Sequence, residues 1–146
     1  MNENCTFTYK ELKNGTLEAT LTGVGSDCTE IVFPSEHEGK KVTKIKAKTP
    51  DYPLLQKVTI PGTVRLTAHF SSHFRFKILV LEEGIKKLPS IDDTIDLEEI
   101  YLPQSLEVLG DCALYGARNL KKIYIPRGTK LKYVGLMALP HDKKGL

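Results

Sequence analysis

Two small groups of side chains have the residue types that could do chemistry. His69 and His73 are four residues apart, a spacing at which two imidazoles on one face of a helix can hold zinc. Asp92, Asp93 and Asp96 form a group of carboxylates of the kind that holds calcium or moves protons. Neither group has the further ligands or the partner base that such a site needs. We interpret both as solvated turns and expect no metal, no cofactor and no catalytic residue.

The sequence also contains no motif for an enzyme with a nucleophilic residue. The glycines are dispersed and make no phosphate-binding loop, and no serine lies in a nucleophile motif. The three cysteines, Cys5, Cys28 and Cys112, include no Cys-x-x-Cys pair. Reduced thiols in a cytosolic protein and a single Cys5–Cys28 bridge in an exported domain are both compatible with this count. The chain is predicted not to be an enzyme.

The amino-acid composition further narrows the class of protein. The chain has 146 residues, 40% of them hydrophobic, which suits one folded domain. Its net charge of +3 gives no indication of nucleic-acid binding. No apolar run approaches the roughly 20 residues that span a bilayer, so no integral membrane segment is expected. The first ten residues, MNENCTFTYK, lack the apolar core of a signal peptide.

A repeated phrase is the strongest pattern in the sequence. It reads LQKVTIP at residues 55–61, FKILVLE at 76–82, LEEIYLP at 97–103 and LKKIYIP at 120–126, with a partial copy at 30–34. The last apolar positions of the five phrases are 27, 21, 21 and 23 residues apart, which is the range of leucine-rich repeats. Each phrase predicts a short strand with alternating faces, and the proline of four of them ends the strand. Because one repeat cannot bury its own apolar face, the repeats must stack.

A second apolar pair follows most of the predicted strands. These pairs are expected to turn inward on the next side of each coil. They are Val42 with Ile45, Ile85 with Leu88, Leu106 with Leu109, and Leu131 with Val134.

The stretch LEEIYLPQSLEVLGDCALYGARNLKKIYIPRGTKLKYVG, residues 97–135, resembles leucine-rich repeats of the BspA type. Leu109-Gly110, Ala113-Leu114, Ala117 and Leu120 occupy the family's Ile-Gly, Ala-Phe, Cys and Leu places. The resemblance covers roughly residues 7–139. It implies a bacterial cell-surface or secreted, adhesin-like role toward another protein. An intracellular scaffold or inhibitor that binds another protein is the alternative.

The expected fold is an α/β, β-rich, right-handed leucine-rich-repeat solenoid with a parallel β-sheet on one face. The outer connections are expected to be irregular, or short helical turns. The whole chain, 1–146, is treated as one domain, with about five coils in 29–139 and a polar tail in 140–146. Residues 6–22 predict an N-terminal β-hairpin that caps the stack. A three-residue loop, Lys13-Asn14-Gly15, pairs Phe7 with Leu21 and collects the apolar side chains on one face.

The outward face of the predicted sheet is the candidate binding site. Stacked parallel strands align equivalent positions into ladders, and aromatic side chains flanked by charges suit an interface. The alternative is that tyrosine is simply favoured in strands. The predicted protein-binding residues are Lys57, Thr59, Ile78, Val80, Glu99, Tyr101, Lys122 and Tyr124.

The expected partner is a protein, bound by a monomeric chain, and nucleic acid is not expected. A cell-surface or secreted location is expected if the chain is a fragment of a longer precursor. A cytoplasmic location is expected if Met1 is the native start.

Overall fold

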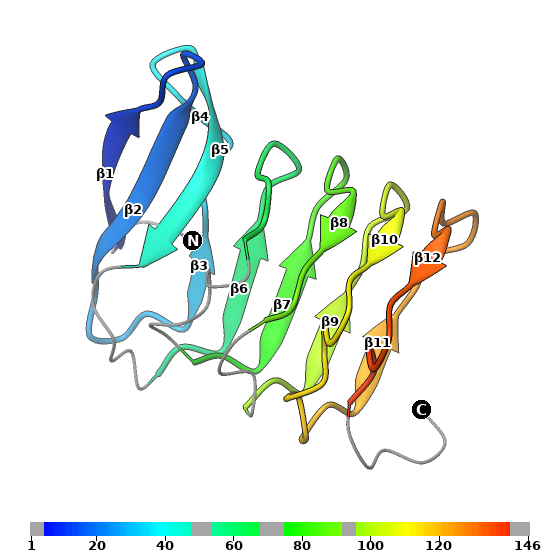
Figure 1. The fold of residues 1–146 in the computed structure, drawn as a ribbon. Helices are drawn as coiled ribbons and strands as arrows, with labels where there is room; N and C mark the ends of the chain where they lie inside the picture. Colours follow the sequence, from blue (N-terminus) through cyan, green and yellow to red (C-terminus); the bar gives the residue numbers. More distant parts are fainter. Residues whose placement is uncertain (1–4, 48–53, 68–74, 92–95, 141–146) are drawn as a thin grey trace.

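The computed structural model describes residues 5–47, 54–67, 75–91 and 96–140. Within these ranges the chain forms twelve strands and no helix (Figure 1). The strands are β1 (Cys5–Glu11), β2 (Leu17–Val24), β3 (Glu30–Val32), β4 (Glu36–His37), β5 (Lys40–Ala47), β6 (Lys57–Ile60), β7 (Ile78–Leu81), β8 (Lys87–Leu88), β9 (Glu99–Tyr101), β10 (Val108–Leu109), β11 (Lys122–Tyr124) and β12 (Tyr133–Val134).

The repeated phrases build one parallel sheet. Its strand order is β11-β9-β7-β6-β3, and the chain makes about four turns between these five strands. Val32, Thr59, Val80, Tyr101 and Tyr124 are successive partners across the sheet, as the sequence spacing predicted. The alternate positions face inward, and the whole ladder from Ile31 through Ile100 is closed to solvent.

The second side of each coil carries a shorter parallel sheet, in the order β12-β10-β8. Figure 1 shows its strands alongside those of the first sheet, with a tight turn joining the two sides of each coil. The predicted inward pairs fill the space between the sheets, with Ile85 and Leu88 at 2% and 0% exposure. The last pair differs: Val134 is 53% exposed, and its strand β12 is the last in the order of the described sheet.

The fold is β-rich, as expected, but the α/β class is corrected: the described outer segments are irregular turns, one of the two expected forms, and contain no helix. In residues 110–120 the backbone bonds run from Ala113 N to the Gly110 oxygen and from Ala117 N to the Leu114 oxygen, at 3.1 Å each. These bonds span three residues, whereas an α-helix repeats bonds that span four. Cys112, inside the first of these turns, has a φ of 56°, which is outside the helical region. The chain therefore closes the coil with successive tight turns.

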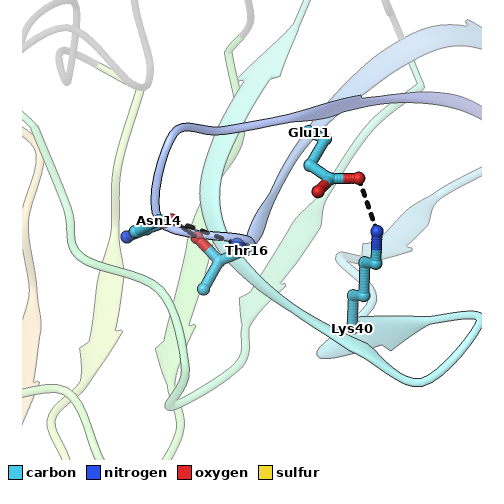
Figure 2. Close-up of polar contacts among 4 residues, drawn as sticks. All are labelled: Glu11, Asn14, Thr16 and Lys40. Carbon is cyan, nitrogen blue, oxygen red and sulfur yellow. Dashed lines mark hydrogen bonds and ion pairs between the residues drawn. The ribbon is translucent and has the colours of Figure 1, made fainter.

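The N-terminal hairpin has the predicted register, with Phe7 opposite Leu21 and Tyr9 opposite Ala19. Its loop is also as predicted: Gly15 has a φ of 84°, the left-handed conformation that glycine adopts without strain. Figure 2 shows the polar contacts that hold this end of the hairpin. The Asn14 side-chain oxygen accepts hydrogen bonds from Thr16 N at 3.0 Å and Thr16 Oγ1 at 2.6 Å.

The hairpin is joined to the first coil by a pairing that the sequence did not predict. Strand β2 pairs in parallel with β5, which gives a four-stranded sheet in the order β1-β2-β5-β4. Lys40 at the start of β5 forms an ion pair with Glu11 at the end of β1 (Figure 2). On the inner side, the rings of Phe7 and Phe33 meet edge to face, with centroids 5.6 Å apart. The hairpin thereby joins the same apolar core as the coils.

Two thiols lie where the hairpin meets the first coil. The Cys5 and Cys28 sulfur atoms are 3.8 Å apart, and both cysteines are free. Burial, followed by the contact with Cys28, raises the pKa of the Cys5 thiol from 9.0 to about 11. The thiol form of Cys5 therefore dominates at neutral pH, and the reactive thiolate is scarce.

We predict that a low-molecular-weight disulfide oxidises this pair to an intramolecular Cys5–Cys28 bond, because a shift of about 2 Å brings the sulfurs to bonding distance. The rate is expected to rise with pH up to the pKa of about 11. Mass spectrometry of the folded chain checks both points, with Cys5→Ser as the control. A product that carries only mixed disulfides would contradict the prediction.

Two glycines set how closely neighbouring coils approach: Gly62 follows strand β6, and Gly84 follows strand β7 in the next coil. A Cβ on Gly62 would overlap the carbonyl oxygen of Glu83, and one on Gly84 would lie 2.7 Å from the Gly62 oxygen. Backbone therefore meets backbone at this turn, with no room for a side chain.

Gly62→Ala is expected to lower the free energy of unfolding by about 3 kcal/mol, because the coils must separate to admit the methyl group. Gly110→Ala is the matched control, since its Cβ would meet the Leu88 oxygen at a milder 3.1 Å. Urea unfolding of both variants measures the difference. Equal losses would show that the close approach at Gly62 does not limit the stacking.

Candidate protein-binding face

The eight predicted residues lie in two adjacent ladders on the outward side of the five-stranded sheet. We call this surface the strand face. One ladder runs through Lys57, Ile78, Glu99 and Lys122, and the other through Thr59, Val80, Tyr101 and Tyr124. The parallel register places equivalent residues of neighbouring repeats side by side, so residues more than 60 positions apart share one surface.

The two tyrosines form the aromatic part of the strand face. The ring centroids of Tyr101 and Tyr124 are 5.7 Å apart, with the planes tilted by 37°. Tyr124 is 49% exposed. This distance lies within the range of favourable aromatic pairs, and each ring has a polar tip to offer a partner.

Two charged neighbours, Glu99 and Lys122, contact Tyr101. The Tyr101 hydroxyl donates to Glu99 Oε1 at 3.1 Å. Lys122 Nζ donates to the same hydroxyl at 3.4 Å and lies 5.1 Å from the centre of the Tyr101 ring. A cation at this distance from an aromatic face is attracted to it. Glu99 and Lys122 thus hold the Tyr101 ring in place before any partner binds.

The strand face is not uniform along the stack. Thr59 is only 9% exposed, which differs from the open position expected for it. In its ladder it lies between Val32 and Val80, with a paired strand on each side. Ile78 and Val80 are half-buried, whereas Lys122 and Tyr124 are exposed. The exposed part of the strand face is therefore on β11, since Glu99 and Tyr101 on β9 are also half-buried.

Sequence reasoning missed one charged member of this face. Glu30 is the partner of Lys57 in the first ladder, and its carboxylate lies 3.6 Å from the Lys57 ammonium. The signal was present, because Glu30-Ile31-Val32-Phe33 aligns with the end of the repeated phrase. The ladder therefore begins one coil earlier than predicted.

The other candidate groups give no site in the described ranges. His69, His73, Asp92 and Asp93 lie outside the described residues. Asp96 forms an ion pair with Arg75 at 3.7 Å. Across the described part of the chain, no three His, Cys, Asp or Glu side chains gather as metal ligands. The same residues include no helix long and apolar enough to cross a membrane.

Comparison with known proteins supports the architecture. No protein-family model and no curated protein matches the chain. The crystal structure of the pneumococcal vaccine antigen PcpA is similar, with a TM-score of 0.58 and 17% identity over 94% of this chain and 46% of that one. This chain thus spans less than half of that antigen, and at this identity the likeness shows the fold alone.

Two further solved structures match more weakly. A leucine-rich cell surface protein of Faecalibacterium prausnitzii A2-165 has a TM-score of 0.42 and 15% identity, over 88% of this chain and 48% of that one. A leucine-rich repeat protein of T. pallidum has a TM-score of 0.34 and 15% identity, over 88% of this chain and 83% of that one. The chain's own repeat and its parallel ladders define it as a leucine-rich-repeat solenoid.

A double-mutant cycle tests the contact that orders the strand face. Lys122→Ala and Tyr101→Leu, alone and together, are expected to give a coupling of about 0.5–1 kcal/mol in the free energy of unfolding, the usual strength of an exposed cation–π pair. Urea unfolding of the four chains measures it. Strictly additive losses would show that Lys122 does not hold Tyr101.

Proposed function

We propose that the chain is a non-catalytic, protein-binding repeat module that recognises its partner through the strand face. The observation that carries the proposal is the Tyr101–Tyr124 pair, ordered by Glu99 and Lys122 on the accessible end of the sheet. Tyrosine is enriched among the residues that dominate binding energy, and preordered side chains lose little entropy on binding. The half-buried Ile78 and Val80 extend this patch with apolar area.

The chemistry of the strand face favours binding over catalysis. Its only described carboxylates, Glu30 and Glu99, are engaged by Lys57 and by the Tyr101 hydroxyl. The Tyr101 hydroxyl already hydrogen-bonds with both Glu99 and Lys122. The neighbouring lysine and glutamate side chains instead supply polar rim contacts around an aromatic centre.

We place the protein at the cell surface or outside the cell, in an adhesin-like role toward another protein. The support is the resemblance of its repeats to the BspA type, together with the fold likeness to a pneumococcal vaccine antigen. An intracellular scaffold or inhibitor is the second candidate. The free cysteines favour it, because adjacent thiols such as Cys5 and Cys28 stay reduced in the cytosol.

We further propose that the coil is right-handed, that the hairpin β1–β2 is its N-terminal cap, and that the chain acts as a monomer. The cap is supported by the burial of Leu17, Ala19 and Leu21 against the first coil. Stacks of repeats need such an end, because an uncovered coil exposes its core to water.

Combined Tyr101→Ala and Tyr124→Ala substitutions are expected to weaken partner binding at least about tenfold while leaving the fold intact, since both rings are anchor residues. Tyr133→Ala is the matched control, because Tyr133 is a similarly exposed tyrosine at 54% but lies on β12 in the other sheet. The immobilised chains are incubated with host extracellular proteins and with lysate of the source cells. Retained proteins are then quantified by mass spectrometry.

The proposal predicts proteins that the wild type and Tyr133→Ala retain and the double variant loses. An identical set on all three chains, with unchanged circular dichroism, would remove the strand face as the binding surface. The fraction that supplies the lost protein separates the two locations: host extracellular protein supports the surface role, and lysate protein supports the scaffold.

A further inference from the structure

Backbone hydrogen bonds join the second sides of the later coils in a regular ladder. Lys132 N and Tyr133 N both donate to the Glu107 oxygen, at 2.8 and 3.2 Å. Glu107 N and Val108 N both donate to the Lys86 oxygen, at 2.8 and 3.0 Å. Each of these coils thus donates twice to one carbonyl group of the coil before it.

The ladder stops at the coil that contains β7. Arg65 is the counterpart of Lys86, because each comes five residues after the last apolar residue of its strand, Ile60 or Leu81. A continued ladder therefore requires bonds from Lys86 N and Lys87 N to the Arg65 oxygen. Within the described ranges neither bond is formed, and the sheet order β12-β10-β8 includes no strand from the coil of β6.

A proline accounts for part of this break. Gly110 N donates to the Leu88 oxygen at 2.8 Å, and Gly135 N donates to the Leu109 oxygen at 2.7 Å. Pro89 holds the same place in the coil of β7, and proline has no N–H group to donate. The second side of this coil therefore lacks one of the donors that hold the later coils together.

A hollow of about 500 Å³ lies between the two coils at this break. Its lining comes from residues 62–66 of one coil and 84–87 of the next, whose turns lie side by side and touch through their glycines (Figure 1). The buried Val64 and Ile85 and the half-buried Leu66 supply the apolar part of the lining. Sites for small organic ligands have volumes of roughly 300–1,000 Å³, so the hollow is of suitable size.

The charged part of the lining is entirely cationic. It consists of Arg65, Lys86 and Lys87, all exposed, and none of the described carboxylates lines the hollow. In the part of the chain that the structure describes, none of the three forms an ion pair, whereas Lys57 and Lys132 on other coils do. Because Arg65 and Lys86 hold equivalent positions in adjacent coils, two like charges lie side by side. A bound anion offsets this repulsion.

These groups match the chemistry of a phosphate monoester. The Arg65 guanidinium has the planar fork that donates two parallel hydrogen bonds to a phosphate, and the two ammonium groups add positive charge. The N–H groups of Lys86 and Lys87, which the interrupted ladder leaves available, resemble the backbone donors of other anion sites. The hollow is larger than a phosphate ion, so an organic group has room beside Leu66.

We propose that the hollow between residues 62–66 and 84–87 is a binding site for a small organic phosphate monoester. Arg65, Lys86 and Lys87 hold the phosphate, and the organic group packs against Leu66. This site lies on the second side of the coils, whereas the strand face lies on the five-stranded sheet. The two sites are therefore independent, and failure of one leaves the other untouched.

The probe is phenyl phosphate, and inorganic phosphate and phenol serve as its two parts. Each compound is titrated into the full isotope-labelled chain, and the amide signals are followed by nuclear magnetic resonance. Phenyl phosphate is expected to shift the Lys86 and Lys87 signals saturably and to leave those of Tyr101 and Tyr124 on the strand face unchanged. It is expected to bind at least about threefold more tightly than inorganic phosphate, because the ring adds apolar contact. Phenol alone is expected to give no saturable shift.

Combined Arg65→Gln and Lys86→Gln substitutions are expected to weaken phenyl phosphate binding at least about tenfold, because they remove two of the three charges. The matched control combines Lys13→Gln with Lys77→Gln, which removes two exposed charges from the hairpin loop and from the segment before β7. Circular dichroism verifies that both variants fold, and the wild-type titration decides the matter where one does not.

Three results would each overturn the proposal. The first is a wild-type chain without saturable shifts at Lys86 and Lys87, and the second is equal weakening in the two double variants. The third is equal affinity for phenyl phosphate and inorganic phosphate, because the organic group would then make no contact.

Discussion

The structure depends on one constraint: the apolar side of each coil is covered only by the next coil. No coil can bury its own strand, so strands β3, β6, β7, β9 and β11 must pair in register to close the core. The inward ladder from Ile31 to Ile100 is sealed for that reason. The Gly62–Gly84 contact also brings neighbouring coils together, because it lets two turns meet backbone to backbone.

The same register determines where side chains are available for binding. Every residue turned away from the core is placed beside its counterpart in the neighbouring repeat, and Tyr101 and Tyr124 become a pair because they hold equivalent positions. In the last described coil the equivalent core residue, Ile125, is 50% exposed. The strand face thus follows from the same packing rule that closes the core.

Much of this was predictable, because the repeat spacing alone fixes which residues become neighbours. The strand positions, the ladders through Tyr101 and Tyr124 and the loop at Gly15 all follow from local patterns. The burial of Thr59 does not, since it depends on how the coils on either side pack around it. The exposure of Val134 is likewise invisible in its own repeat, which has the same apolar pattern as buried ones. In the described residues 110–120, turns replace a helix because of the backbone geometry around Cys112, which the expected family pattern does not specify.

The most direct test of the account is the register of the parallel sheet in solution, measured by inter-strand nuclear Overhauser contacts in an isotope-labelled chain. The stacked-coil account predicts backbone contacts of Tyr101 with both Val80 and Tyr124, and none between Val80 and Tyr124. A register shifted by one residue would turn the tyrosines toward the core. Contacts that place Tyr101 opposite Ile123, or no contact between β9 and β11, would contradict both the packing rule and the surfaces derived from it.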